Sequence, residues 1–268
     1  MLRARVIPAL LLHDGALVKT QRFARPRYVG DPANTIRIFN ELEVDELMLI
    51  DILATRRGTG PDLETLRTVA DECFMPLGYG GGIRSFEQAR AVFEIGVEKV
   101  MLNSAALADP ELITRIATHY GSQAVVIGID FKRGLGGTRR VYRHADRRST
   151  GTQVLDWARE VEDRGAGEIL LTDVDREGSW QGYDVEFYRS VASAVSIPVI
   201  AHGGARSIQD IADVTARGGC GAAAVGSMVV FQKKDMGVLV NFPDQRLLAK
   251  ALIDSRTSDA EARQASPA

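Results

Sequence analysis

Short apolar runs alternate with amphipathic stretches along almost the whole chain. The apolar runs are bounded by turn residues and predict strands, whereas apolar residues spaced three or four apart in the stretches between them predict helices. The expected strands cover residues 5–12, 46–52, 75–79, 99–103, 124–130, 168–174, 198–202 and 222–226. The expected helices cover residues 32–43, 63–73, 86–95, 110–120, 153–163, 185–194 and 208–216.

This alternation indicates an α/β fold with a parallel sheet. The predicted strands are too apolar to expose one face to water, so helices must cover them. Eight strand–helix units in a chain of 268 residues match the size of a (β/α)8 TIM barrel. A doubly wound open sheet is the alternative.

An internal repeat favours the barrel. GGIRSFEQARAVFEIG, from Gly81, aligns with GGARSIQDIADVTARG, from Gly203, at a shift of 122 residues. The same shift places DELMLID on GEILLTD and matches Asp51 to Asp173. Two similar half-barrels close naturally into one ring.

The first strands of the two halves also correspond. ALLLHDG lies on GIDFKRG at a shift of 119 residues, which sets Leu11 against Asp130. No linker separates the halves, so we expect a single barrel domain over residues 1–254. Residues 255–268 are polar and rich in small side chains, and we expect them to form a disordered tail.

Composition narrows the possible partners. Hydrophobic residues make up 45% of the chain, charged residues 25%, and the net charge is −2, so neither nucleic acid nor a membrane is expected to bind. The N-terminal apolar stretch is too short to span a bilayer and lacks a cleavage site, which favours a cytoplasmic protein. No metal-ligand spacing is present, and we expect neither metal nor cofactor.

The carboxyl ends of the predicted strands carry residues suited to phosphate. Glycine pairs follow the third and seventh strands, and Asn-Ser and Gly-Ser follow the fourth and eighth; such backbone N–H groups and hydroxyls hold anions. Two equivalent sets predict two phosphate sites on opposite sides of the barrel mouth, suited to a bisphosphate. Alternatively, the glycines only allow tight turns. The candidate phosphate- and substrate-binding residues are Lys19, Asp51, Gly81, Gly82, Asn103, Ser104, Asp173, Glu177, Gly178, Gly203, Gly204, Gly226 and Ser227.

Three further observations concern possible catalytic residues at the same end of the strands. Asp130 ends the first strand of the second half and is the best candidate for proton transfer. Its counterpart, Leu11, can neither take nor give a proton. Lys19 could meet a substrate or phosphate, or it could be a solvated loop lysine.

Charged residues also stand at the opposite ends of four strands. Arg5, Glu46, Lys99 and Glu168 lie at or near the starts of the first, second, fourth and sixth strands. Two cations and two anions could form a closed ring across the barrel floor. The alternative is that these charges are simply solvated.

Several segments resemble the cyclase (synthase) subunit of imidazole glycerol phosphate synthase. They include RVIPALLLHDG, VDELMLIDI, PLGYGGGIRS, EKVMLNSAAL, GSQAVVIGID and RGAGEILLTDVDREG, and the similarity covers roughly residues 1–252. The resemblance implies a (β/α)8 barrel that docks a glutaminase at its N-terminal face. Ammonia passes through that barrel to the C-terminal face, where it reacts with a phosphorylated ribonucleotide.

The resemblance also implies residue roles. The family's ammonia gate falls on the four floor residues, and Glu98 falls where the family usually has an aspartate that contacts the glutaminase. Of the family's two catalytic aspartates, Asp130 is kept, whereas the other position holds Leu11. His202 replaces a small serine and Glu177 replaces an aspartate.

The loss of one acid points to a divergent branch of the family. The LLL segment, CFMPLGYGGGIR and GVLVNFP are similar to relatives that accompany a glutaminase and an ATP-dependent N-acetyl sugar amidotransferase in surface-polysaccharide biosynthesis. We therefore expect an ammonia-channelling subunit of a glutamine amidotransferase. The alternatives are an authentic cyclase in which Asp14 or Asp51 covers for Leu11, and a non-enzymatic scaffold that only activates its glutaminase.

Overall fold

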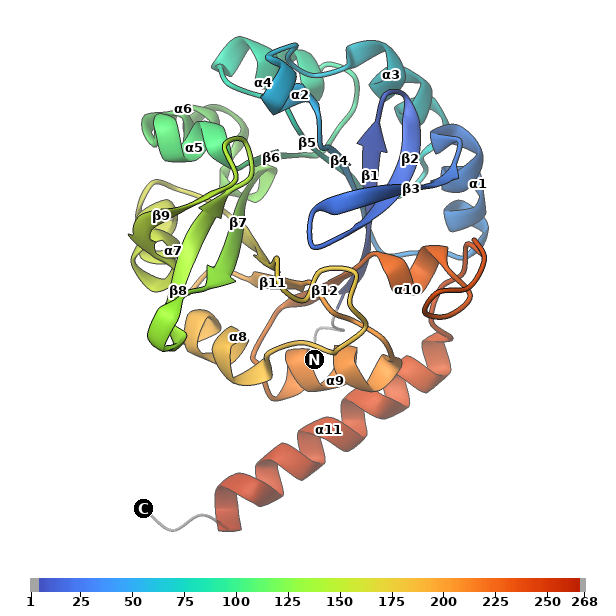
Figure 1. Ribbon diagram of the computed structural model, residues 1–268, viewed down its shortest axis with the longest axis vertical. Helices are drawn as coiled ribbons and strands as arrows, with labels where there is room; N and C mark the ends of the chain where they lie inside the picture. Colours follow the sequence, from blue (N-terminus) through green and yellow to red (C-terminus); the bar gives the residue numbers. More distant parts are fainter. Residues whose placement is uncertain (1–4, 266–268) are drawn as a thin grey trace.

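Eight parallel strands close into a barrel in the computed structural model (Figure 1). The structure describes residues 5–265, with all their side chains except those of residues 135 and 258–265. In order around the barrel the strands are β1 (Arg5–His13), β4 (Leu47–Asp51), β5 (Leu77–Gly80), β6 (Lys99–Leu102), β7 (Val125–Arg133), β10 (Glu168–Asp173), β11 (Val199–His202) and β12 (Ala222–Val225). The ring is complete because β12 pairs with β1 and β7 pairs with β10, both in parallel. The predicted (β/α)8 barrel is confirmed.

Helices surround the barrel at the positions that the apolar pattern predicts. Those between the barrel strands are α1 (Pro32–Glu41), α3 (Leu63–Glu72), α4 (Phe86–Phe93), α6 (Glu111–Tyr120), α7 (Val154–Asp163), α8 (Val185–Ala192) and α9 (Ile208–Ala216). Three short helices, α2 (Ala54–Arg57), α5 (Ser104–Ala108) and α10 (Ser227–Val230), follow strands β4, β6 and β12, and two single 3-10 turns occupy Ser122–Ala124 and Leu135–Gly137. The caps are the expected type: the side chains of Ser85 and Ser207, in equivalent places of the two halves, accept hydrogen bonds from Gln88 N and Asp210 N.

Two hairpins extend the barrel strands above its mouth. Strands β2 (Ala16–Gln21) and β3 (Ala24–Gly30) continue from β1, while β8 (Arg139–Arg143) and β9 (Arg148–Gln153) continue from β7. β1 and β7 are the matching strands of the two half-barrels, so the repeat includes these hairpins. The apolar pattern did not predict them because β3 and β9 are mostly exposed, so it is mainly the inner strand of each hairpin, β2 or β8, that buries side chains.

A second, small apolar core fills the inside of the barrel, separate from the main core between sheet and helices. Its members point inward from seven strands: Ile7, Ala9, Met48, Met101, Val126, Leu170, Ile200, Ala222 and Ala224. On the side of the interior formed by β1 and β12, three of these residues are alanines, so the side chains there are small. This core separates the floor of the barrel from its mouth.

The C-terminal helix crosses the domain boundary that we placed after residue 254. Helix α11 spans Gln245–Ala265 and packs against α9, where Ser255 is buried and bonded to Gln209 and Asp213. The Ala, Glu, Arg and Gln residues of this segment favour a helix, which its polarity alone did not reveal. Residues 266–268 of the expected tail lie outside the described residues. Among the described helices, none is long and apolar enough to cross a membrane.

Candidate functional site

Four charged side chains form a closed ring across the barrel floor. Arg5 donates to Glu46 Oε2 at 2.7 Å and to Glu168 Oε1 at 2.5 Å. Lys99 Nζ donates to Glu46 Oε1 at 2.8 Å and to Glu168 Oε2 at 2.9 Å. Each cation therefore bridges the same two carboxylates, and each carboxylate uses both of its oxygens.

The strand register explains why these residues meet. Arg5, Lys99 and Glu168 are the first residues of β1, β6 and β10, and Glu46 directly precedes β4. Side chains at equivalent heights on barrel strands point to a common layer. The carboxylates are well buried, with 4% and 10% of the Glu46 and Glu168 side chains exposed, and their pairing with two cations offsets the cost of taking them out of water.

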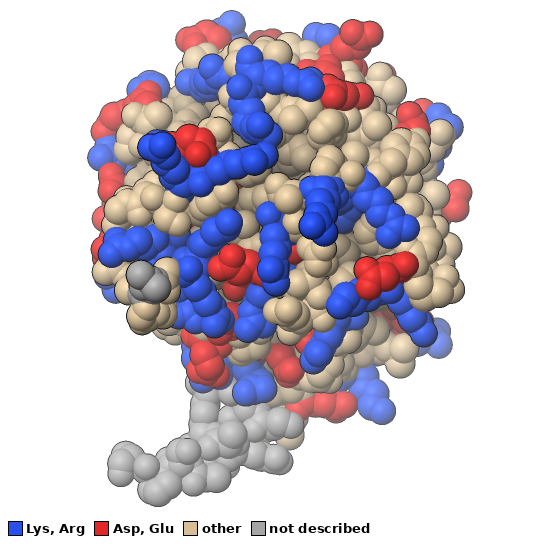
Figure 2. Space-filling model, in the orientation of Figure 1, with Lys and Arg blue, Asp and Glu red and all other residues tan. Residues whose placement is uncertain are grey.

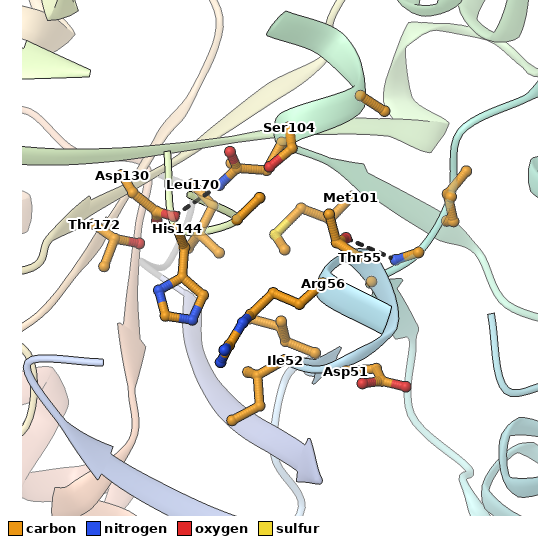
Figure 3. A pocket seen from close by; sticks show the side chains of 18 of the residues that line it. Asp51, Ile52, Thr55, Arg56, Met101, Ser104, Asp130, His144, Leu170 and Thr172 are labelled. Carbon is orange, nitrogen blue, oxygen red and sulfur yellow. Dashed lines mark hydrogen bonds between the residues drawn. The ribbon is translucent and has the colours of Figure 1, made fainter. Parts of the chain in front are cut away.

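At the other end of the barrel the mouth holds a cavity of about 300 Å³ (Figure 3). Apolar side chains from the upper barrel form its base, among them Leu11, Ile50, Met101 and Leu170. Polar groups stand on its walls, including Asp130, Thr172, Asn103 and His144. Cavities of this size with few convergent polar groups are typical of small-molecule sites.

Asp130 is the buried acid of this cavity. Its carboxylate accepts a hydrogen bond from Asn103 Nδ2 at 2.8 Å. Burial raises the Asp130 pKa to about 7, although hydrogen bonds from Asn103 and Thr172 act in the opposite direction. An acid with that pKa can both take and give a proton near neutral pH. Leu11, from the matching strand, also lines the cavity and offers only an apolar surface.

The first glycine pair opens onto the cavity. Gly81, Gly82, Asn103 and Ser104 all line it, as the sequence predicted for one end of the mouth. Close packing also requires these glycines: a Cβ atom on Gly81 would lie 2.5 Å from the backbone oxygen of Asp51. The tight-turn interpretation therefore holds here, and the ligand interpretation stays a prediction.

The second glycine pair faces a space of only about 10 Å³. Lys19, Gly178 and His202 line this space together with Gly203, Gly204, Gly226 and Ser227. Lys19 is not a solvated loop residue: its ammonium forms a buried ion pair with Glu177 at 2.5 Å. The two ends of the mouth are thus alike in sequence but different in shape.

Two of the predicted ligand-binding acids, Asp51 and Asp173, accept hydrogen bonds from the backbone of the turns that follow them. Asp51 Oδ1 accepts hydrogen bonds from Leu53 N and Ala54 N at 2.8 and 3.0 Å. Asp173 Oδ1 accepts from Asp175 N and Arg176 N, the equivalent residues of the second half, at 3.0 and 3.3 Å. Asp173 is completely buried, so its side chain holds the turn, whereas Asp51 still lines the large cavity.

The tips of the two hairpins meet above the mouth. Phe23, between β2 and β3, packs its ring edge-on against His144, between β8 and β9, with ring centroids 5.2 Å apart. Both line the large cavity. The His144 pKa is lowered by burial and by the nearby charges of Arg56, Arg147 and Lys132, so the imidazole is neutral at pH 7.

Basic side chains surround the mouth on the face shown in Figure 2. The two hairpins, residues 16–30 and 139–153, contain a single acidic residue, Asp146. Their exposed arginines, which we call the basic collar, are Arg22, Arg25, Arg27, Arg143, Arg147 and Arg148. This local positive charge contrasts with the net charge of −2 and would attract an anionic ligand or an acidic protein surface.

Comparison with known proteins identifies the family. The sequence model of the histidine biosynthesis proteins matches residues 5–235. The chain belongs to the histidine biosynthesis protein family. It is 50% identical to imidazole glycerol phosphate synthase subunit hisF2 of Pseudomonas aeruginosa, over 91% of this chain and 97% of that one. It is 43% identical to imidazole glycerol phosphate synthase subunit HisF of Leptospira interrogans, over the same shares of the two chains. The names of both relatives mark their assignment as provisional. Imidazole glycerol phosphate synthase subunit HisF of Hyphomonas neptunium is 44% identical over 86% of this chain and 91% of that one.

In this HisF-type chain the predicted residues divide among three places. The floor ring gathers its four predicted members and the mouth gathers its own except Asp173, which is buried in a turn, whereas Glu98 belongs to neither group. Glu98 is exposed and accepts a hydrogen bond from Leu77 N at 2.7 Å, next to the start of β5 at the N-terminal face. A contact between Glu98 and a glutaminase stays a prediction.

Sequence reasoning missed several groups of the mouth. Thr172 and His144 were not among the predicted site residues, and neither were Phe23 and Arg56. Thr172 could have been found by its position, because it is the next-to-last residue of β10 and alternation places it on the same face as Glu168 and Leu170. The hairpin tips carried no such signal, because their approach to the mouth depends on how the strands extend.

Proposed function

We propose that this HisF-type chain is the ammonia-conducting synthase subunit of a glutamine amidotransferase. A partner glutaminase docks at the N-terminal face, and ammonia passes the charged ring, crosses the barrel interior and reaches an acceptor at the mouth. One observation carries this proposal: an intact ring of four bonded charges lies below a mouth in which Leu11 stands where the matching strand has Asp130.

The ring suits a gate for a small neutral molecule. Its four contacts, of 2.5–2.9 Å, close the floor to bulk ions. Lys99 is the side chain best suited to swing aside, because its flexible stem carries a point charge, whereas Arg5 holds its two acids with separate nitrogens of a planar group. Above the ring, the apolar interior favours uncharged ammonia over ammonium, since a charge there would lose its hydration.

The loss of the second acid argues against the cyclisation reaction. Asp130 can transfer a proton near pH 7, but no carboxylate faces it from position 11. Removing one of two groups that act together generally costs orders of magnitude in rate. The acceptor that we propose, from the sequence resemblance, is an N-acetylated sugar of a surface polysaccharide, amidinated by an ATP-dependent amidotransferase. The basic collar supports the docking of an acidic partner surface at the mouth.

Authentic cyclase activity in histidine biosynthesis is the second candidate, because relatives such as the Hyphomonas neptunium protein carry the name of that enzyme. Free ammonia bypasses the glutaminase, so the purified chain with free ammonia and the bisphosphorylated ribonucleotide of that reaction tests cyclisation directly. We expect no turnover with the native chain. Turnover at the rate of a HisF subunit that has both aspartates would overturn our proposal, and a gain of activity in Leu11→Asp would count against the second candidate.

Isotope competition tests the conduit. The chain, its cognate glutaminase and the sugar amidotransferase are supplied with glutamine labelled with ¹⁵N in the amide and with excess unlabelled ammonium. We expect the product to keep most of the label. Lys99→Glu should release the label to solution while glutamine hydrolysis continues, and Arg115→Glu, a charge reversal on the exposed surface of α6, is the matched control. Full dilution of the label with the native chain would refute a closed route.

A further inference from the structure

The two ends of the mouth come from equivalent sequences but present opposite surfaces. The end at Gly81 and Gly82 opens into the cavity of about 300 Å³, whereas the end at Gly203 and Gly204 keeps about 10 Å³. Since the backbone turns are alike, the difference must come from side chains. Three of them account for it.

The Lys19 side chain covers the Gly-Ser pair of the second end. A Cβ atom on Gly226 would lie 2.6 Å from Lys19 Cε and 2.8 Å from its Nζ, so the lysine lies directly on this glycine. Glu177 neutralises it at 2.5 Å, with 4% of the lysine side chain and 1% of the glutamate side chain exposed. The cation that an anionic ligand would need is already paired.

Glu177 acts as a built-in anion. Besides Lys19, its oxygens accept hydrogen bonds from Thr20 Oγ1 and from Phe23 N, both at 3.1 Å. These donors come from the β2–β3 hairpin, which therefore closes over the second end. Burial alone would raise the Glu177 pKa, but the charge of Lys19 and the hydrogen bonds from Lys19 and Phe23 N lower it overall, so the carboxylate stays ionised.

His202 forms the wall between the two spaces. It is buried and lines both of them, and its Nδ1 lies 3.2 Å from Thr172 Oγ1. Burial and the charge of Lys19 lower the His202 pKa to about 4, so the ring adds bulk to this end without adding positive charge at pH 7.

The first half of the chain has small residues at the corresponding positions. The shift of 122 residues that relates the halves places Glu177 on Thr55 and His202 on Gly80. Thr55 lines the open cavity and bonds to Gly82 N through its hydroxyl at 3.2 Å. The open end thus shows what the closed end would be without its two large side chains.

We propose that the mouth binds a ligand with one phosphate group, at the Gly82–Ser104 end, and that Lys19, Glu177 and His202 exclude a second phosphate from the other end. Arg56 and Arg84 line the open end and supply positive charge there. The uncharged body of the ligand lies over the apolar base toward Asp130. This inference goes beyond the proposed function, because it does not depend on ammonia transfer.

The test compares two probes that differ by one phosphate. Ribulose 5-phosphate and ribulose 1,5-bisphosphate are titrated into the purified full chain by isothermal calorimetry at neutral pH. We expect the native chain to bind the bisphosphate no more than about threefold more tightly than the monophosphate. Ser104→Ala should weaken both probes to the same extent.

Two variants open the closed end. His202→Gly with Glu177→Thr copies the first half and frees Lys19; because a charged hydrogen bond is worth a tenfold to hundredfold change in affinity, the bisphosphate should gain about tenfold or more over the monophosphate. His202→Gly alone keeps the ion pair between Lys19 and Glu177 and should give a smaller gain in affinity for the bisphosphate. This single variant replaces the double variant if circular dichroism shows that the double variant does not fold.

Two results of the titrations would overturn the inference, and a third would overturn the role of one residue. A native chain that binds the bisphosphate tenfold more tightly than the monophosphate, or that binds neither probe, overturns the inference. Equal ratios in the native chain and in a folded His202→Gly variant overturn the assigned role of His202. Because no glutaminase or acceptor is present, failure of ammonia transfer leaves this result unaffected, and the reverse also holds.

Discussion

Replacing Lys99 by methionine tests whether the floor ring is a cooperative charged unit. Methionine keeps the apolar stem but removes two hydrogen bonds, of 2.8 and 2.9 Å, to Glu46 and Glu168. Two buried carboxylates then share the single cation of Arg5. Removing one member of a buried pair costs about 3–5 kcal/mol, and because Arg5 still contacts both acids, we expect the lower end, about 3 kcal/mol of unfolding free energy.

The measurement is urea unfolding at neutral pH, with Arg115→Met as the matched control. Arg115 pairs with Asp109 at 2.7 Å, but 49% of each side chain is exposed, so its loss should cost less than about 1 kcal/mol. Adding Glu46→Gln to Lys99→Met restores equal numbers of positive and negative charges and should recover part of the loss. If Lys99→Met and Arg115→Met destabilise the chain equally, or if Glu46→Gln adds its full independent cost, the ring is not a coupled unit.

Three further predictions concern the stability of the folded chain, two through its dependence on pH and one through a glycine substitution. The raised Asp130 pKa of about 7 means that the folded chain holds a proton that the unfolded chain has lost, so stability relative to Asp130→Asn should fall, by at most about 4 kcal/mol, as pH rises from about 4 to 7 in urea titrations. The lowered His202 pKa of about 4 has the opposite effect: stability relative to His202→Gln should fall, by at most about 3 kcal/mol, as pH drops from about 6.5 to 4. Flat difference curves would refute either pKa. Gly82→Ala should destabilise the chain by at least about 2 kcal/mol more than Gly136→Ala, because both have positive φ but only the former would push a Cβ to 2.6 Å from Gly60; similar melting temperatures would contradict this packing.

The two half-barrels have diverged at their matching positions. In the repeat, Leu11 corresponds to Asp130, Gly80 to His202, and Thr55 to Glu177. Each difference lies at the mouth, whereas the turns after β4 and β10 keep equivalent hydrogen bonds, from Leu53 N to Asp51 and from Asp175 N to Asp173. The repeat therefore preserves the scaffold and varies the surface that meets a ligand.

The sequence alone determined the barrel and its repeat. Eight apolar runs with helical stretches between them require a parallel sheet covered by helices, and the internal repeat favoured a closed barrel over a doubly wound open sheet. The floor residues could also be predicted as a group, because the first residues of parallel strands share one layer. Their position along each strand is a local property, and strand pairing converts it directly into proximity.

Only the tertiary structure decided what the mouth looks like. Lys19 and Glu177 are 158 residues apart, and nothing local indicates that they pair and fill the second phosphate end. The hairpin that brings Lys19 there is held by pairing with β1, by hydrogen bonds to Glu177 and by the buried side chains of Leu17 and Val29, but that short apolar pattern does not indicate which distant residue Lys19 meets. The physical reason is that burial leaves a periodic record in the sequence, whereas long-range polar contacts between loops leave none.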